Sequence, residues 1–112
     1  MIAVGILTVA SGELVGFSIN DHAGYGEAGN DIVCAAVSSA AYLIANTITD
    51  VMHLHATIRV DEENADMLLR IEEKDAVRCR DLLTGFKLHI VGLEEQYPEN
   101  IQVSYLEVRS NA

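Results

Sequence analysis

An uncharged run from Ile32 to Thr49 is the feature that most restricts the folds open to this chain. The run is long enough for about five helical turns. Its apolar residues lie almost all round such a helix, so we expect the helix to be buried on more than one side. We reject a membrane span because much of the run is alanine and several residues suit lipid poorly. These residues are Ser38, Ser39, Asn46, Thr47 and Thr49.

The segments around this helix predict five strands and a second helix. Ile2–Val9 and Leu14–Ile19 form a probable hairpin around a turn at Ser11 and Gly12. Strict alternation predicts a strand over His53–Val60, with Leu54, Ala56, Ile58 and Val60 facing inward. Further strands are expected at Met67–Ile71 and Ile101–Arg109. From Lys74 to the stop at Pro98, a helix carries apolar residues at three- and four-residue steps. They are Cys79, Leu83, Phe86, Ile90, Leu93 and Tyr97.

This order, ββαββαβ, predicts one α+β domain over residues 1–112. The economical arrangement has two helices packed on one face of a mostly antiparallel five-stranded sheet. A second copy of the chain is able to cover the other face of the sheet or the uncharged helix, which would make a homodimer.

The charge balance restricts the partners. The formal net charge is −10, and only 7 residues are Lys or Arg, so nucleic-acid binding is not expected. An acidic surface suits a basic protein or peptide, although simple solubility explains the charge equally well. The chain has two cysteines, and we expect neither a disulfide framework nor a signal peptide at Met1. These features favour a protein of the reducing cytoplasm that is not attached to a membrane.

The segment from His22 to Cys34 carries the strongest chemical signal. A cysteine at a helix N-terminus is readily ionised, because the helix dipole lowers the thiol pKa, and an imidazole is suited to take its proton. Gly24, Gly26 and Gly29 let the intervening loop fold back and open for a peptide. The plainer interpretations are a buried helical cysteine and an exposed loop histidine.

Several neighbours are supporting candidates. Asp31 is able to cap the helix, as is Asn30, or to orient His22, and Asp21 is a rival orienter. Ser38 lies one helical turn after Cys34 and can hydrogen-bond near the thiolate or to a helix carbonyl. Backbone N–H groups at the helix start, including that of Cys34, are candidates for an oxyanion hole.

Other signals are weaker. His53 and His55 share a predicted strand face, but no third ligand is placed by spacing, so solvated residues are favoured over a metal site. Cys79 lies on the apolar stripe of the second helix, which favours core packing over a resolving thiol. We expect no metal and no cofactor.

The sequences from His22 to Glu27 (HAGYGE) and from Asp31 to Ser38 (DIVCAAVS) resemble the ribosomal-processing cysteine protease family, Prp. The chain length, the ββαββαβ order and the segment from Glu94 to Pro98 (EEQYP) agree with the family more loosely. One departure is Asp21, because family members usually have Gly before the motif histidine. A carboxylate there would favour the imidazolium form of His22.

The resemblance implies a cytoplasmic homodimeric protease with His22 and Cys34 as its catalytic dyad. It implies a substrate as well: the N-terminal extension of large-subunit ribosomal protein number twenty-seven, cut just after a pair of aromatic residues. The glycine loop, with Gly24, Tyr25, Gly26 and Gly29, is expected to gate the site, and Asp31 and Ser38 to support it. The alternative is a non-catalytic, acidic, dimeric module that binds a basic ribosomal protein.

Overall fold

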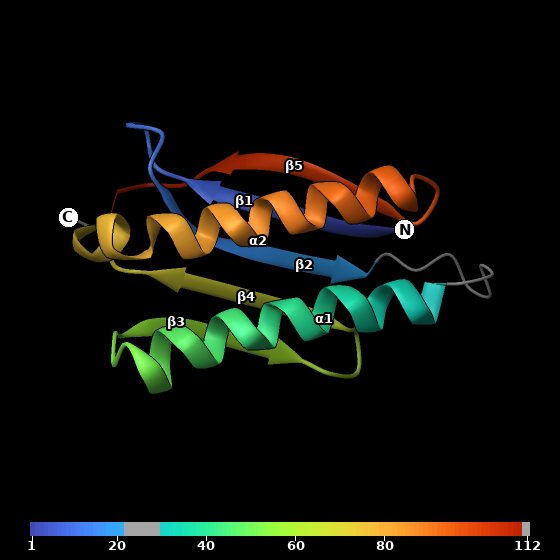
Figure 1. Ribbon diagram of the computed structural model, residues 1–112, viewed down its shortest axis with the longest axis horizontal. Coiled ribbons are helices and arrows are strands. Elements are labelled where there is room, and N and C mark those ends of the chain that lie inside the picture. The colour runs from blue at the N-terminus through green and yellow to red at the C-terminus, as the bar shows by residue number, and fades with distance from the viewer. Residues whose placement is uncertain (22–29, 111–112) are drawn as a thin grey trace.

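The computed structural model of this chain describes residues 1–21 and 30–110. These residues follow the predicted order ββαββαβ (Figure 1). The strands are β1 (Ile2–Thr8), β2 (Leu14–Asp21), β3 (Ala56–Asp61), β4 (Asp66–Ile71) and β5 (Ile101–Glu107). The long helices are α1 (Asn30–Asn46) and α2 (Ala76–Gln96); a π-helical turn (Thr47–Val51) extends α1, and a 3₁₀ turn (Glu73–Asp75) precedes α2.

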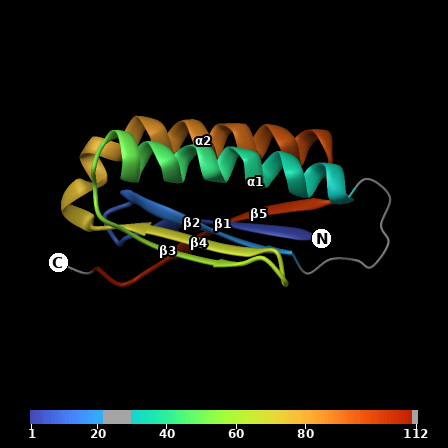
Figure 2. The ribbon, with the colours of Figure 1, turned by 90° about the horizontal axis from the view of Figure 1, so that it is seen from below.

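All five strands form one sheet in the order β3-β4-β2-β1-β5. The β1–β5 pair is parallel and the other three pairs are antiparallel, so the predicted mostly antiparallel sheet is confirmed. Both helices lie on the same face of this sheet (Figure 2). In Figure 1, α2 covers the β1–β2 side and α1 the β3–β4 side. The predicted α+β class is therefore correct.

The core lies between this face of the sheet and the helices. Alternate residues of β1 and β2 point into it, including Ile2, Val4 and Phe17. The ring of Phe17 stacks on that of Phe86 from α2, with ring centroids 4.3 Å apart. Aromatic pairs at this separation stabilise a core beyond the area that they bury. The predicted buried stripe of α2 is confirmed at Cys79, Leu83, Phe86 and Ile90.

The prediction for the third strand is partly wrong. The strand begins at Ala56, so His53 and His55 precede it, and His53 has a left-handed backbone with φ 57°. Ile58 and Val60 face inward as predicted, because they pair with the buried Leu69 and Met67 of β4, but they are 37% and 45% exposed. The reason is position, because β3 is the edge strand and pairs with β4 alone.

The expectation that the uncharged helix is buried on more than one side is wrong for a single copy of the chain. Its inner stripe, including Val33, Val37 and Ala41, packs into the core. The outer residues Ile32 and Leu43 are 70% and 65% exposed. The segment Asp31–Val51 has the length and hydropathy of a membrane span, but a core helix meets the same criteria.

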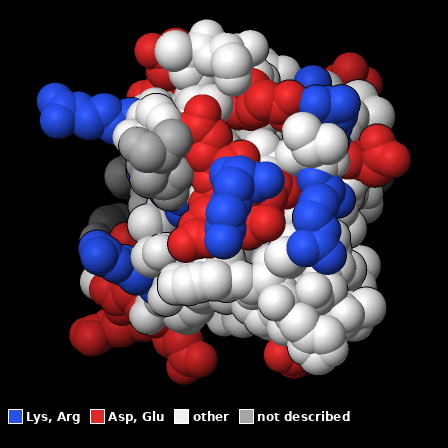
Figure 3. Space-filling view, turned by 90° about the vertical axis from the view of Figure 1, so that its left-hand side faces the viewer, with Lys and Arg blue, Asp and Glu red and all other residues white. Residues whose placement is uncertain are grey.

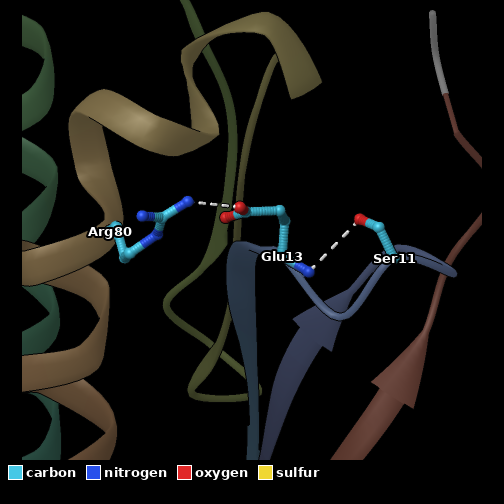
Figure 4. A network of polar contacts seen from close by, with 3 residues as sticks. All are labelled: Ser11, Glu13 and Arg80. Atoms are coloured by element: carbon cyan, nitrogen blue, oxygen red, sulfur yellow. Dashed lines mark hydrogen bonds and ion pairs between the residues drawn. The ribbon is translucent and has the colours of Figure 1, made fainter.

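Polar contacts join the β1–β2 turn to α2. Arg80 donates a hydrogen bond to Glu13 at 2.5 Å, and the backbone N–H of Glu13 lies 3.5 Å from the Ser11 hydroxyl (Figure 4). The end of the molecule seen in Figure 3 mixes basic and acidic side chains. Exposed pairs of this kind contribute about 0–1 kcal/mol each.

Gly16 is predicted to be essential to the β2–β4 pairing. Its φ is +153°, and a Cβ atom there would lie 1.9 Å from the Leu69 carbonyl oxygen. We expect Gly16→Ala to lower the free energy of unfolding by about 2 kcal/mol or more, because backbone has to move. Urea denaturation measures this. Gly85→Ala is the control: its site is open, so helix propensity should make it neutral or stabilising by roughly 0.5–1 kcal/mol.

Candidate active site

Cys34 lies near the start of α1, at the end of the molecule where β2 also ends (Figure 1). It is half-buried and packs against the hydrophobic core. In the sheet register, Asp21 of β2 pairs with Ile2 of β1. Two and four residues further along β1, Val4 and Ile6 pair with core residues of β2, so all these residues lie on one face. The side chain of Asp21 therefore lies on the helix-covered face, toward the start of α1.

Ser38 is the described residue that directly contacts the thiol. It lies one helical turn after Cys34, is half-buried, and forms a side-chain hydrogen bond with the sulfur. Of the two interpretations left open for this hydroxyl, the structure therefore favours the contact with Cys34. Such a bond stabilises the thiolate because the hydroxyl is able to donate to it.

The described surroundings raise the pKa of the Cys34 thiol. Burial is the largest cause, and the negative charges of Asp21 and Asp31 raise the pKa further. The hydrogen bond from Ser38 opposes them by lowering it. The expectation of a lowered pKa is thus wrong for the part of the chain that the structure describes. A buried thiol facing carboxylates loses more from ionisation than it gains from one hydroxyl.

The position of Cys34 in the helix also differs from the prediction. The helix begins at Asn30, so Asn30 and Asp31 are helical residues and not its cap, while Cys34 is the fifth residue. From the fifth residue on, each backbone N–H bonds within the helix. The N–H of Cys34 is therefore not available for an oxyanion hole, and the helix dipole acts mainly on the turn before it.

The other half of the predicted constellation lies outside the described residues. This applies to His22 and to the proposed gating residues Gly24, Tyr25, Gly26 and Gly29. The strand and the helix that flank this segment bring Asp21, Asp31 and Cys34 to one end of the fold. The dyad geometry therefore stays a prediction.

Two pockets lie on opposite flanks of α1. A groove of about 750 Å³ separates α1 from α2 and is lined by residues such as Ala36, Ala40 and Phe86. A smaller pocket of about 190 Å³ lies on the other flank, where Ser38 and Tyr42 face β3 and β4. Ser38 lines the smaller pocket and also contacts the thiol, so this one residue connects the pocket to Cys34.

The remaining predicted residues lie elsewhere. Cys79 is fully buried in α2, which confirms the core interpretation, and both cysteines are free thiols. Within the described residues, no group of three metal-ligating side chains is found, His53 and His55 included. The small pocket was missed by the sequence analysis, although Cys34, Ser38 and Tyr42 follow one another at the spacing of a helical stripe.

Comparison with known proteins agrees with this description. The sequence profile of the family described as “Cysteine protease Prp” matches residues 1–102. The ribosomal processing cysteine protease Prp of Staphylococcus aureus is 28% identical over 105 residues, which is 94% of this chain and 99% of that protein.

Solved structures agree as well. The S. aureus protease in complex with a substrate peptide has a TM-score of 0.85 and 26% identity, and the match covers 95% of this chain and 100% of that one. The same protease with a covalently linked product peptide has a TM-score of 0.80 and 27% identity, with the same coverage. A Streptococcus mutans protein has a TM-score of 0.80 and 26% identity, covering 96% of both chains. The chain therefore belongs to the cysteine protease Prp family, and it is a hydrolase.

Proposed function

We propose that this cysteine protease removes the N-terminal extension of large-subunit ribosomal protein number twenty-seven, with Cys34 as nucleophile and His22 as base. The observation that carries the proposal is Cys34 itself. It is a half-buried, free thiol near the start of α1, and it is hydrogen-bonded to Ser38, which lines a pocket. The family relationship supports the reaction class, and the S. aureus complex with a substrate peptide supports a peptide substrate.

The reaction divides into two steps. His22 takes the proton from Cys34 Sγ, and the thiolate attacks the scissile carbonyl carbon. The C–N bond breaks as His22 returns the proton to the leaving amine, which leaves a thioester. Water then hydrolyses the thioester and frees the thiol. The S. aureus protease with a covalently linked product peptide is consistent with a covalent intermediate in this family.

The raised pKa of Cys34 supports a dyad in which the base deprotonates the thiol during the reaction and not before it. Burial and the two carboxylates favour the protonated thiol, so we expect attack to require a base at the moment of reaction. The carboxylates of Asp21 and Asp31 disfavour the thiolate and favour a cation close by. When the proton moves to His22, they stabilise the imidazolium that forms. Asp21 and Asp31 are therefore proposed to support the base more than the nucleophile.

The charge and the exposed apolar surface support the remaining parts of the proposal. A net charge of −10 suits a basic ribosomal protein as substrate, and that substrate implies a cytoplasmic enzyme. The apolar groove between α1 and α2, which the exposed Leu43 helps to line, supports a homodimer that covers this face.

Cleavage of a peptide that spans the extension and the mature start of the ribosomal protein tests the proposal. Wild-type protein is expected to cut once, after the aromatic pair. Cys34→Ala and His22→Ala are expected to lower the rate at least about 1,000-fold, because each removes a member of the dyad. Mass spectrometry of the products measures both the site and the rate.

Cys79→Ala is the matched control, because it removes the other thiol and leaves the site untouched. Its cleavage rate should equal that of wild type once folding is verified by circular dichroism. Persistent cleavage by Cys34→Ala would exclude Cys34 as nucleophile. Tight binding of the peptide without any cut by folded, reduced wild type would instead support the acidic binding module.

The charges around the thiol predict a pH dependence. Asp21→Asn removes a charge that raises the pKa of Cys34, so the rate of alkylation by iodoacetamide should reach its midpoint at lower pH. Ser38→Ala removes a bond that lowers the pKa, so its midpoint should move to higher pH. Peptide mapping by mass spectrometry separates Cys34 from the buried Cys79.

Asp50→Asn controls for the loss of one negative charge. Asp50 lies beyond the end of α1, more than about 20 Å from Cys34 along the helix, where salt screens its effect. Its alkylation profile should match that of wild type. Shifts of Asp21→Asn and Ser38→Ala in the same direction would contradict the assigned causes.

A further inference from the structure

The pocket beside Ser38 has an apolar floor that the proposed reaction does not use. One row of cross-strand neighbours forms it: Ile19 of β2 pairs with Met67 of β4, which pairs with Val60 of β3. Ile19 and Met67 are buried, whereas Val60 is 45% exposed at the open edge of the sheet. A peptide is thus able to enter from the edge strand and reach the floor.

The wall of the pocket connects it to the nucleophile. Cys34, Ser38 and Tyr42 follow one another every four residues, so they form one stripe along α1. At 1.5 Å per residue, Ser38 and Tyr42 lie about 6 and 12 Å along the helix from Cys34. An extended peptide advances about 3.3 Å per residue, so this distance corresponds to roughly two to four residues from the scissile bond.

The size of the pocket fits one large apolar side chain. Its volume is about 190 Å³, and a cavity of about 150 Å³ is known to admit a benzene ring. The ring of Tyr42 in the wall is 43% exposed and offers a surface on which an aromatic or branched side chain packs.

The rim of the pocket is acidic. Asp61, Glu62 and Asp66 line it, and no Lys or Arg is among its lining residues. Asp61 and Asp66 stand directly opposite each other in the β3–β4 register, an arrangement that destabilises a strand pair. Hydrogen bonds from Asn64 lower the pKa of Asp61, so its charge is present at neutral pH. A basic side chain next to the pocket would relieve this repulsion.

From this floor, wall and rim we propose a specificity subsite. It holds one large apolar side chain of the substrate, two to four residues from the scissile bond, with a Lys or Arg of the same peptide beside Asp61, Glu62 and Asp66. The proposal rests on the proposed function, because Cys34 has to be the point of attack. It assigns Tyr42 and Val60 to substrate binding.

Binding to the inactive Cys34→Ala protein tests the subsite without cleavage. The probe is a fluorescein-labelled peptide that spans the extension and mature start of the ribosomal protein, with each residue replaced by Ala in turn, and anisotropy reports its Kd. When Tyr42→Ala is added to the Cys34→Ala protein, the Kd for the unaltered peptide should rise about tenfold or more, as expected for a buried aromatic contact. One peptide in the set, in which Ala replaces an apolar residue two to four residues from the scissile bond, should show the same rise in Kd with the Cys34→Ala protein.

The effects of Tyr42→Ala and of the Ala replacement in the peptide should not add when both are present, because both changes remove the same contact. Tyr105→Ala is the matched control: Tyr105 is 60% exposed on β5, the strand at the opposite edge of the sheet. Equal effects of Tyr42→Ala and Tyr105→Ala would overturn the subsite, as would simple addition of the protein and peptide changes, or no binding at all.

The acidic rim has its own test. Asp66→Asn should weaken binding and reduce its dependence on salt, and the effect should disappear for the peptide whose neighbouring Lys or Arg is replaced. Glu107→Gln, on exposed β5, is the charge-matched control. Equal losses from both variants would contradict recognition of a basic side chain at the rim.

Kinetics of the active protein separate this inference from the proposed function. Tyr42→Ala should raise KM with kcat little changed, because it removes binding and not chemistry. Cleavage with an unchanged KM would overturn the subsite and leave the protease assignment standing. Tyr42-dependent binding to a wild-type protein that cuts nothing would overturn the assigned reaction, and with it the role of this pocket as a specificity subsite of a protease.

Discussion

The packing of one stripe of α1 on the sheet is the interaction on which the rest of the site depends. Val33, Val37 and Ala41 face the core, so the rotation of the helix about its axis is set by burial of apolar surface. Every other residue of α1 then has a defined direction. Cys34 lies at the border of the buried stripe, where its thiol is half-buried. One flank of α1 turns toward α2, and the other faces the β3 edge.

This placement has an electrostatic consequence. A thiol at the border of the core pays the desolvation cost of ionisation, and the carboxylates at the same end of the fold add to it. These surroundings favour the protonated thiol over a permanent thiolate.

Much of the fold was predictable because each helix and strand carries its own period. The strand alternation at Met67–Ile71 and the three- and four-residue steps of α2 both match their observed elements. The two wrong expectations about burial, at β3 and at the outer face of α1, share one cause. Alternation at Ile58 and Val60 indicates a strand but does not say whether that strand lies at the centre or the edge of a sheet. The apolar outer face of α1 likewise does not say what covers it.

The sequence by itself determined the order of the elements, the family, and the residues that are able to do chemistry, because these depend on local periodicity and on short motifs. Only the tertiary structure decided which charges surround Cys34 and which flank of α1 faces an open pocket. The pairing of Ile19, Met67 and Val60 joins residues that are far apart in the chain. Such contacts arise from the sheet register and the rotation of α1, which are set jointly by the whole core.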